Sequence, residues 1–222
     1  MIPRNRHLRT LAVFALAGAG LLAWPAVASA QSVSGSASAV RANVFGMTTV
    51  LAGTGSLTDA LDMREASQMS AGILSLGSAD VLHAATGSSV TDGGPSDYVS
   101  SEASMADVSL AMAGNSVSAA FVMARALAPV GGAPVGTSEV DGLTINGVAI
   151  WATGQPNQTI PLLGGRVIIN EQIPSSTGTT VNAVHVIVDG LADVVLASAE
   201  AGVGSGGASS PPPIIPPLPR LF

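Results

Sequence analysis

The chain has 222 residues, of which 47% are hydrophobic, 3% are aromatic and none is cysteine. Fourteen acidic residues outnumber eight basic ones, and this balance disfavours binding to nucleic-acid phosphates. The absence of cysteine excludes thiolate metal sites, cysteine nucleophiles and disulfides, and the low aromatic content disfavours ligand recognition through aromatic anchors.

The first thirty residues have the pattern of a secretory signal peptide. A basic start (Arg4–Arg9) precedes an uncharged apolar run over 11–22, and Ala28–Ala30 places small residues before a cleavage site. The apolar run is shorter than the roughly 20 residues of a membrane span, which is the alternative interpretation. We therefore expect cleavage after Ala30 and a mature chain that is secreted, extracellular or at the cell surface, with the periplasm as the other compartment. That chain keeps five arginines against 14 acidic residues, a formal charge of −9.

The region after residue 30 has the pattern of strands and tight turns. Serines alternate with small apolar residues over 32–39, and the apolar positions continue through Val40, Ala42 and Val44. Four dipeptides that tolerate φ > 0 each separate two β-rich runs: Gly114-Asn115, Asn146-Gly147, Gly164-Gly165 and Asp189-Gly190. These features predict an all-β domain over residues 31–203, a mostly antiparallel β-sandwich with hairpin connections.

Two segments have less regular patterns. Thr58–Gln68 gathers charged residues without a clear 3.6-residue period, so a short helix and a charged surface loop both stay open. Val181–Val188 is apolar on nearly both faces, which predicts a central strand covered on two sides.

The end of the chain has the composition of a flexible tail. Residues 204–222 combine a Gly/Ser-rich linker with the proline-rich sequence PPPIIPPLPRLF. We expect this tail to lie outside the fold, and it contains no long apolar helix that predicts a terminal membrane span.

The segment 138–203 carries five ordered sequence blocks. They are SEVDGLTING (138–147), TGQPNQTIPL (153–162), RVIINEQ (166–172), TTVNAVHVIVDG (179–190) and LADVVLASAEAGV (191–203). The order GQPNQT, NEQ and VNAxHV resembles the choice-of-anchor P family of bacterial secreted proteins. The resemblance implies an exported β-rich domain that is joined to variable C-terminal surface-sorting signals, with no established enzymatic activity. The proline-rich tail stands here in place of an LPxTG-like or PEP-type motif, which leaves anchoring, free secretion and non-covalent association open.

The chemistry-bearing residues do not form a recognisable catalytic motif. His83 and His185 are far apart and lack metal-ligand spacing, and we interpret His185 as a satisfied core imidazole rather than a ligand or base. No GxSxG elbow is present. A carboxylate pair for glycoside cleavage could be drawn from several acids, but most are explained as strand-end or turn residues: Glu102, Asp107, Glu139, Asp141, Glu171, Asp189 and Asp193.

Asp92 and Asp97 are the one metal candidate. They place two carboxylates in a bent loop, where hard oxygen ligands for calcium could converge, although an Asx-rich turn is the favoured interpretation. Asn157 begins an Asn-Gln-Thr glycosylation pattern but is interpreted as a turn asparagine. Asn170 and Glu171 are assigned to side-chain capping of the neighbouring backbone. We assign no cofactor and no catalytic residue.

These observations favour a secreted, non-catalytic envelope or extracellular-matrix protein with a structural or adhesive role. One alternative is a binding module for a glycan or another envelope protein. The other is a secreted carboxylate-dependent hydrolase. The partner, the oligomeric state and the anchoring are not determined by the sequence.

Overall fold

The computed structural model describes residues 31–204, so the expected signal peptide and residues 205–222 of the tail lie outside the described residues. The described chain is all strand, which confirms the all-β class. Within it, no helix is long and apolar enough to cross a membrane. The strands are β1 (Ser32–Val44), β2 (Met47–Gly53), β3 (Leu61–Ile73), β4 (Gly77–Ser89), β5 (Tyr98–Met112), β6 (Asn115–Pro129), β7 (Val135–Asp141), β8 (Thr144–Ile145), β9 (Val148–Ala149), β10 (Gln158–Leu162), β11 (Gly165–Pro174), β12 (Gly178–Val188) and β13 (Ala192–Gly204).

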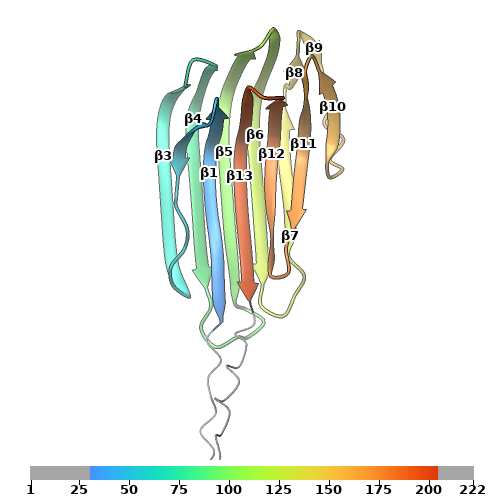
Figure 1. Cartoon of the computed structure of the whole chain (residues 1–222). Coiled ribbons are helices and arrows are strands. Elements are labelled where there is room, and N and C mark those ends of the chain that lie inside the picture. Colours follow the sequence, from blue (N-terminus) through green and yellow to red (C-terminus); the bar gives the residue numbers. More distant parts are fainter. Residues whose placement is uncertain (1–30, 205–222) are drawn as a thin grey trace, which may run out of the picture.

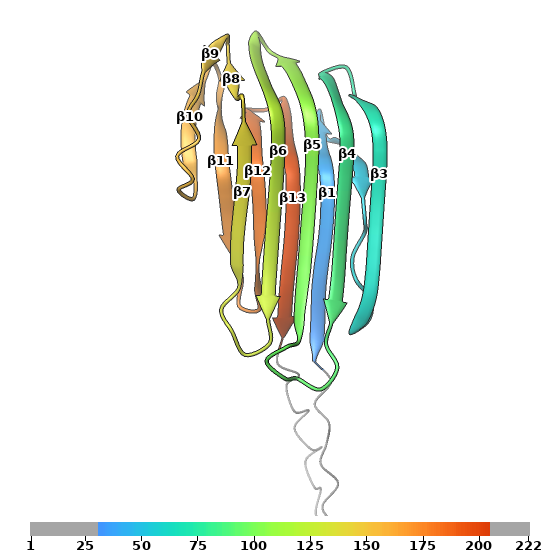
Figure 2. The same cartoon turned by 180° about the vertical axis from the view of Figure 1, so that it is seen from behind.

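Two antiparallel sheets pack against each other as the predicted β-sandwich (Figure 1). Sheet A has six strands in the order β10-β11-β12-β13-β1-β2. Sheet B has seven, in the order β3-β4-β5-β6-β8-β9, with β7 also paired to β6, and Figure 2 shows its outer face. Strands β1 and β13 pair from Ser32↔Gly204 to Val44↔Ala192, so the two ends of the described chain lie at the same end of the sandwich.

The sheets meet through small side chains, mostly alanine and valine, that are fully buried. A Cβ atom on Gly35 of β1 would lie 2.6 Å from Leu57 Cδ1, and one on Gly136 of β7 would collide with Val181 Cγ2 of β12. The sheets therefore approach each other more closely than an alanine at either position would allow. Some large side chains are nevertheless buried between the sheets, among them Leu82, Met105 and Leu196.

All four predicted hairpins are present. Asp189–Leu191 joins β12 to β13, with Gly190 at φ = +70°. Asn146 and Gly147 join β8 to β9 with φ of +51° and +76°. The other two turns begin one residue earlier than the dipeptides suggested, at Ala113-Gly114 and Leu163-Gly164. The reason is that glycine occupies the second turn position in both.

The segment predicted as a short helix or charged loop is instead mostly strand β3. Its charges are divided between the two faces: Asp62 and Arg64 are half-buried and paired at 3.0 Å, while Glu65 is exposed. Because β3 is the edge of sheet B, solvent reaches both faces and hides the two-residue alternation on which strand prediction depends.

Strand β12 is central in its sheet, but its apolar run has a different cause from the predicted two-sided cover. Val181 and Ala183 face the core, and the next residue, Val184, faces the core as well. The strand thus inverts its inward phase halfway along. The outer face carries the partly exposed His185 and Ile187.

This inversion occurs along one line in each sheet, and we call these lines the crease. In sheet A each pair of neighbouring strands leaves out one pair of opposed residues, and the crease passes through these positions. They are Asn170 on β11, Ala183 on β12, Ala197 on β13, Ala39 on β1 and Ala52 on β2. Asn170, Ala197 and Ala52 have left-handed φ of +53°, +52° and +44°, and Val81 and Asp107 mark the line in sheet B with +48° and +47°.

Neighbouring residues at the crease share one side of the strand. In sheet A both members of the pair Ala39 and Val40 face the core. In sheet B both members of the pair Asp80 and Val81 are exposed. The side of sheet A that faces the core and the side of sheet B that faces solvent point in the same direction. The paired side chains of the two sheets therefore project the same way, and the sheets stay in contact.

Val81 tests the strain at the crease. Its side chain is 56% exposed, and a left-handed conformation is unfavourable by about 1–2 kcal/mol for an ordinary residue, more so for a β-branched one. Asparagine tolerates this conformation, so Val81→Asn is expected to raise the free energy of unfolding by about 1 kcal/mol. Urea unfolding measures the change.

The matched control is Val50→Asn on β2. Val50 is 51% exposed and has no left-handed φ. Asparagine is unfavourable in ordinary strands, so this variant is expected to be less stable than wild type. Equal destabilisation by both substitutions would show that Val81 stores no strain.

Candidate functional site

The sequence blocks that carry the resemblance meet in one hydrogen-bond network around β11. The Gln172 N–H donates to Asn157 Oδ1 (3.0 Å), the Asn157 N–H donates to the Asn170 carbonyl (2.8 Å), and Asn170 Nδ2 donates to the Gly154 carbonyl (3.0 Å). Asn157 has φ = +60°, as expected for a turn asparagine. The GQPNQT loop is therefore clamped onto the NEQ strand.

The same loop is closed internally and tied to the other sheet. Gln158 Oε1 accepts from the N–H and the hydroxyl of Thr153 (2.8 and 2.9 Å), and its Nε2 donates to the Trp151 carbonyl (2.9 Å). Gln172 Nε2 donates to the Gly136 carbonyl on β7 at 3.0 Å. Gln158 thus closes the loop, and Gln172 ties strand β11 of sheet A to strand β7 of sheet B.

Glu171 points to the outer face of sheet A, opposite to its two neighbours. Its Oε2 accepts from Asn182 Nδ2 (2.6 Å) and lies 2.8 Å from His185 Nδ1. His185 Nε2 lies 3.0 Å from Asp193 Oδ1, and the Ser198 hydroxyl donates to Asn182 Oδ1 at 2.7 Å. We call these five residues the Glu171 cluster; it links β11, β12 and β13.

Both ring nitrogens of His185 have partners within the Glu171 cluster. Each ring nitrogen faces a carboxylate, and the ring donates to both only when both nitrogens carry protons. The side chain is 13% exposed. The imidazole has a partner at each ring nitrogen, but it lies on the outer face of sheet A and not in the core, where the sequence analysis expected it. His83 lies on the outer face of sheet B, with Nε2 3.2 Å from Glu65 Oε1.

The structure distributes the candidate carboxylates over separate places. Glu171 and Asp193 contact the same imidazole. Glu102 pairs with Arg125 at 2.5 Å. The rest lie at the crease, on β7 or in a turn, and are Asp107, Glu139, Asp141 and Asp189.

The calcium candidates form a tightly bonded turn. The carboxylate of Asp97 accepts from the N–H groups of Thr91 (2.9 Å), Asp92 (3.1 Å) and Gly93 (2.7 Å) and from the Thr91 hydroxyl (3.1 Å). Asp92 Oδ1 accepts from the Gly94 N–H at 3.0 Å. Burial disfavours the charged form of Asp97, but these donors outweigh it and lower the pKa of the carboxyl. The donors favour the Asx-turn interpretation.

Metal-ligand clusters of three or more His, Cys, Asp or Glu side chains do not occur within residues 31–204. The calcium hypothesis for Asp92 and Asp97 stays a prediction.

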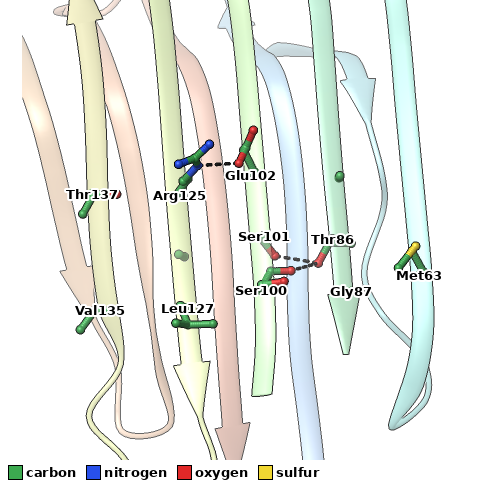
Figure 3. A pocket seen from close by; sticks show the side chains of 12 residues that line it. Met63, Thr86, Gly87, Ser100, Ser101, Glu102, Arg125, Leu127, Val135 and Thr137 are labelled. Carbon is green, nitrogen blue, oxygen red and sulfur yellow. Dashed lines mark hydrogen bonds and ion pairs between the residues drawn. The ribbon is translucent and has the colours of Figure 1, made fainter. Parts of the chain in front are cut away.

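The outer face of sheet B carries an open groove that the sequence analysis did not identify (Figure 3). Five of its lining residues lie directly opposite one another on the neighbouring strands β3 to β7 and form one row across the sheet. The Glu102–Arg125 pair lies two residues further along β5 and β6. The volume is about 540 Å³, and the row is Met63, Gly87, Ser100, Leu127 and Val135. The groove brings together residues that are up to 74 positions apart (Met63 to Thr137), so no local motif predicts it.

Comparison with protein-family models, with curated proteins and with solved structures gave no match to this chain.

The Glu171 cluster yields a stability prediction. Glu171→Gln removes a charge-assisted acceptor while Asn182 and His185 keep their positions. We expect the free energy of unfolding to fall by about 2 kcal/mol, as for other hydrogen bonds to charged groups. Glu139→Gln on the exposed side of β7 is the control and should change stability by less than about 0.5 kcal/mol. Equal stability of the two variants would show that the cluster does not hold the strands.

Asp97 yields a pH prediction. Its pKa is lower in the folded protein than in the unfolded chain, where an aspartate has a pKa of about 3.9. The stability it contributes is therefore present above about pH 4 and is lost as the pH falls through the folded-state pKa. Asp97→Asn should be less stable than wild type at pH 7 and should lose less stability on acidification. Thermal unfolding from pH 7 to pH 2 measures this, and parallel profiles for the two proteins would contradict it.

Proposed function

We propose that this chain is a secreted, non-catalytic module of the cell envelope or extracellular matrix, with a structural or adhesive role. The observation that supports this most directly is the use of the motif residues. Asn157, Asn170, Glu171, Gln172 and His185 direct their polar atoms at other parts of the fold. Because these side chains hold strands and loops together, we assign contact with any partner to the exposed faces of the two sheets.

The surface offers contacts of the kind such a role needs. Exposed apolar side chains lie on the outer face of sheet B: Met63 and Leu127 line the groove, and Leu61 and Tyr98 lie outside its lining. The resemblance to the choice-of-anchor P family supports export and retention near the cell. It is part of the proposal that the tail, residues 205–222, serves as the retention element.

A glycan- or envelope-protein-binding module is the second candidate, and the groove is the observation that favours it. Its lining combines apolar side chains with the Glu102–Arg125 pair and Thr137. A carboxylate-dependent hydrolase is less favoured, because the acid that lines the groove is already paired with a cation.

Fractionation of the producing cells tests the proposal. We expect the protein in the envelope or matrix fraction, with Gln31 as its first residue by N-terminal sequencing. A protein that keeps Arg4–Arg9 and stays in the cytoplasm would overturn it.

A variant that lacks residues 205–222 separates retention from folding. We expect its melting temperature to match that of the full chain while the protein shifts from the cell fraction to the medium. An unchanged distribution would remove the tail from the proposal, and a large loss of stability would show that the tail packs on the domain.

A further inference from the structure

The four sheet edges of the described chain are protected to very different degrees. Three of them are short: β2 has seven residues, β10 has five with Pro161 among them, and the edge of sheet B opposite β3 is divided between β7 (seven residues) and β9 (two). Short strands and proline are devices that prevent one sheet from pairing with another. The fourth edge, β3, has thirteen residues (Figure 1).

Strand β3 is protected over only part of its length, because its charged side chains all lie in its first half. It contains neither lysine nor proline, and it pairs with β4 alone among residues 31–204. The main-chain N–H and C=O groups on its other side are therefore free to bond another strand. Leu61, Met63 and Met69 are 66%, 86% and 81% exposed along it.

The charges of β3 indicate which strand pairs with it. Asp62, Arg64 and Glu65 all lie in its first half, and the second half, Ser67–Ile73, is uncharged. In an antiparallel pair of two β3 strands centred on Ser67, each charged half faces an uncharged half. Like charges are then not directly opposed, which is the arrangement that cross-strand pairing requires.

We propose that β3 is a self-association edge, through which two copies of this chain pair antiparallel about a twofold axis near Ser67. This deepens the proposed function by naming a second copy as a partner, and it rests on the sheet edge rather than on the location of the protein. The pairing joins the two B sheets into one continuous sheet and places the two grooves on a shared face.

The other edges are poorer partners for β3, and the uncharged edge strand β2 is too short to pair with all of it, with seven residues against thirteen. Strand β7 carries Glu139 and Asp141, which would add to the acidic charge of Asp62 and Glu65. Strand β10 has Pro161, which cannot donate to a ladder. A closed twofold dimer is therefore favoured over an open head-to-tail fibre.

A single introduced cysteine tests the geometry, because the chain has none of its own. Directly opposed residues of an antiparallel pair have Cα atoms about 4.5–5.5 Å apart, within the range of a disulfide. Ser67→Cys in the purified protein should form a covalent dimer under mild oxidation. Thr159→Cys, at an exposed position on edge strand β10, is the matched control and should stay monomeric. Equal cross-linking of both variants, or of neither, would overturn the proposal.

A charge exchange tests the pairing without a covalent bond. Ser67→Lys and Ser67→Glu each place like charges across the twofold axis, so each variant alone should sediment as a monomer where wild type sediments as a dimer. An equimolar mixture should restore the dimer. Wild type that is monomeric throughout, or variants that dimerise like wild type, would overturn the proposal. Because these measurements use purified protein, their failure leaves the cell-fractionation result, and hence the proposed function, unaffected.

Discussion

The crease is the constraint on which most of the structure depends. Left-handed residues such as Ala197 and Val81 reverse which side chains face the core, and they do so in both sheets. A strand that inverted alone would place polar residues in the core over half its length. The sheets stay packed because all the long strands invert together. Asn170 suits this line, since asparagine tolerates φ > 0, and the Glu171 cluster lies in the rows beside it.

The sequence predicted what local chemistry determines. Asp189-Gly190 and Asn146-Gly147 gave correct hairpins because a positive φ at a turn needs particular residues whatever surrounds them. The inversion also leaves a local trace: Ala39 and Val40 are two successive core residues in an otherwise alternating strand. The sequence analysis instead predicts an uninterrupted alternation through Val40, and for residues 181–188 a strand covered on both faces. Strand β3 was missed because its environment at the edge, rather than its own pattern, makes it a strand.

The candidate site was predictable only in part, for a similar reason. Asn170 binds a backbone carbonyl, that of Gly154, as the expected capping role requires, but the expectation was wrong for Glu171, whose carboxylate contacts the side chains of Asn182 and His185. The partnership of Glu171 with Asp193 through His185 depends on three strands in register, which no single stretch of sequence encodes. The groove depends on five strands. Sites assembled from side chains on separate strands need the fold before they can be recognised.

Charge adds a condition to any contact between copies. Residues 31–204 hold four arginines and 14 acidic residues, and Arg64 and Arg125 are already paired with Asp62 and Glu102. Two copies therefore repel each other at long range, but this repulsion is screened beyond about 8 Å at physiological ionic strength. Main-chain hydrogen bonds along a strand act at contact and are not screened in this way. Association through an edge that keeps its charges in one half should thus strengthen as salt rises, whereas contacts through ion pairs weaken.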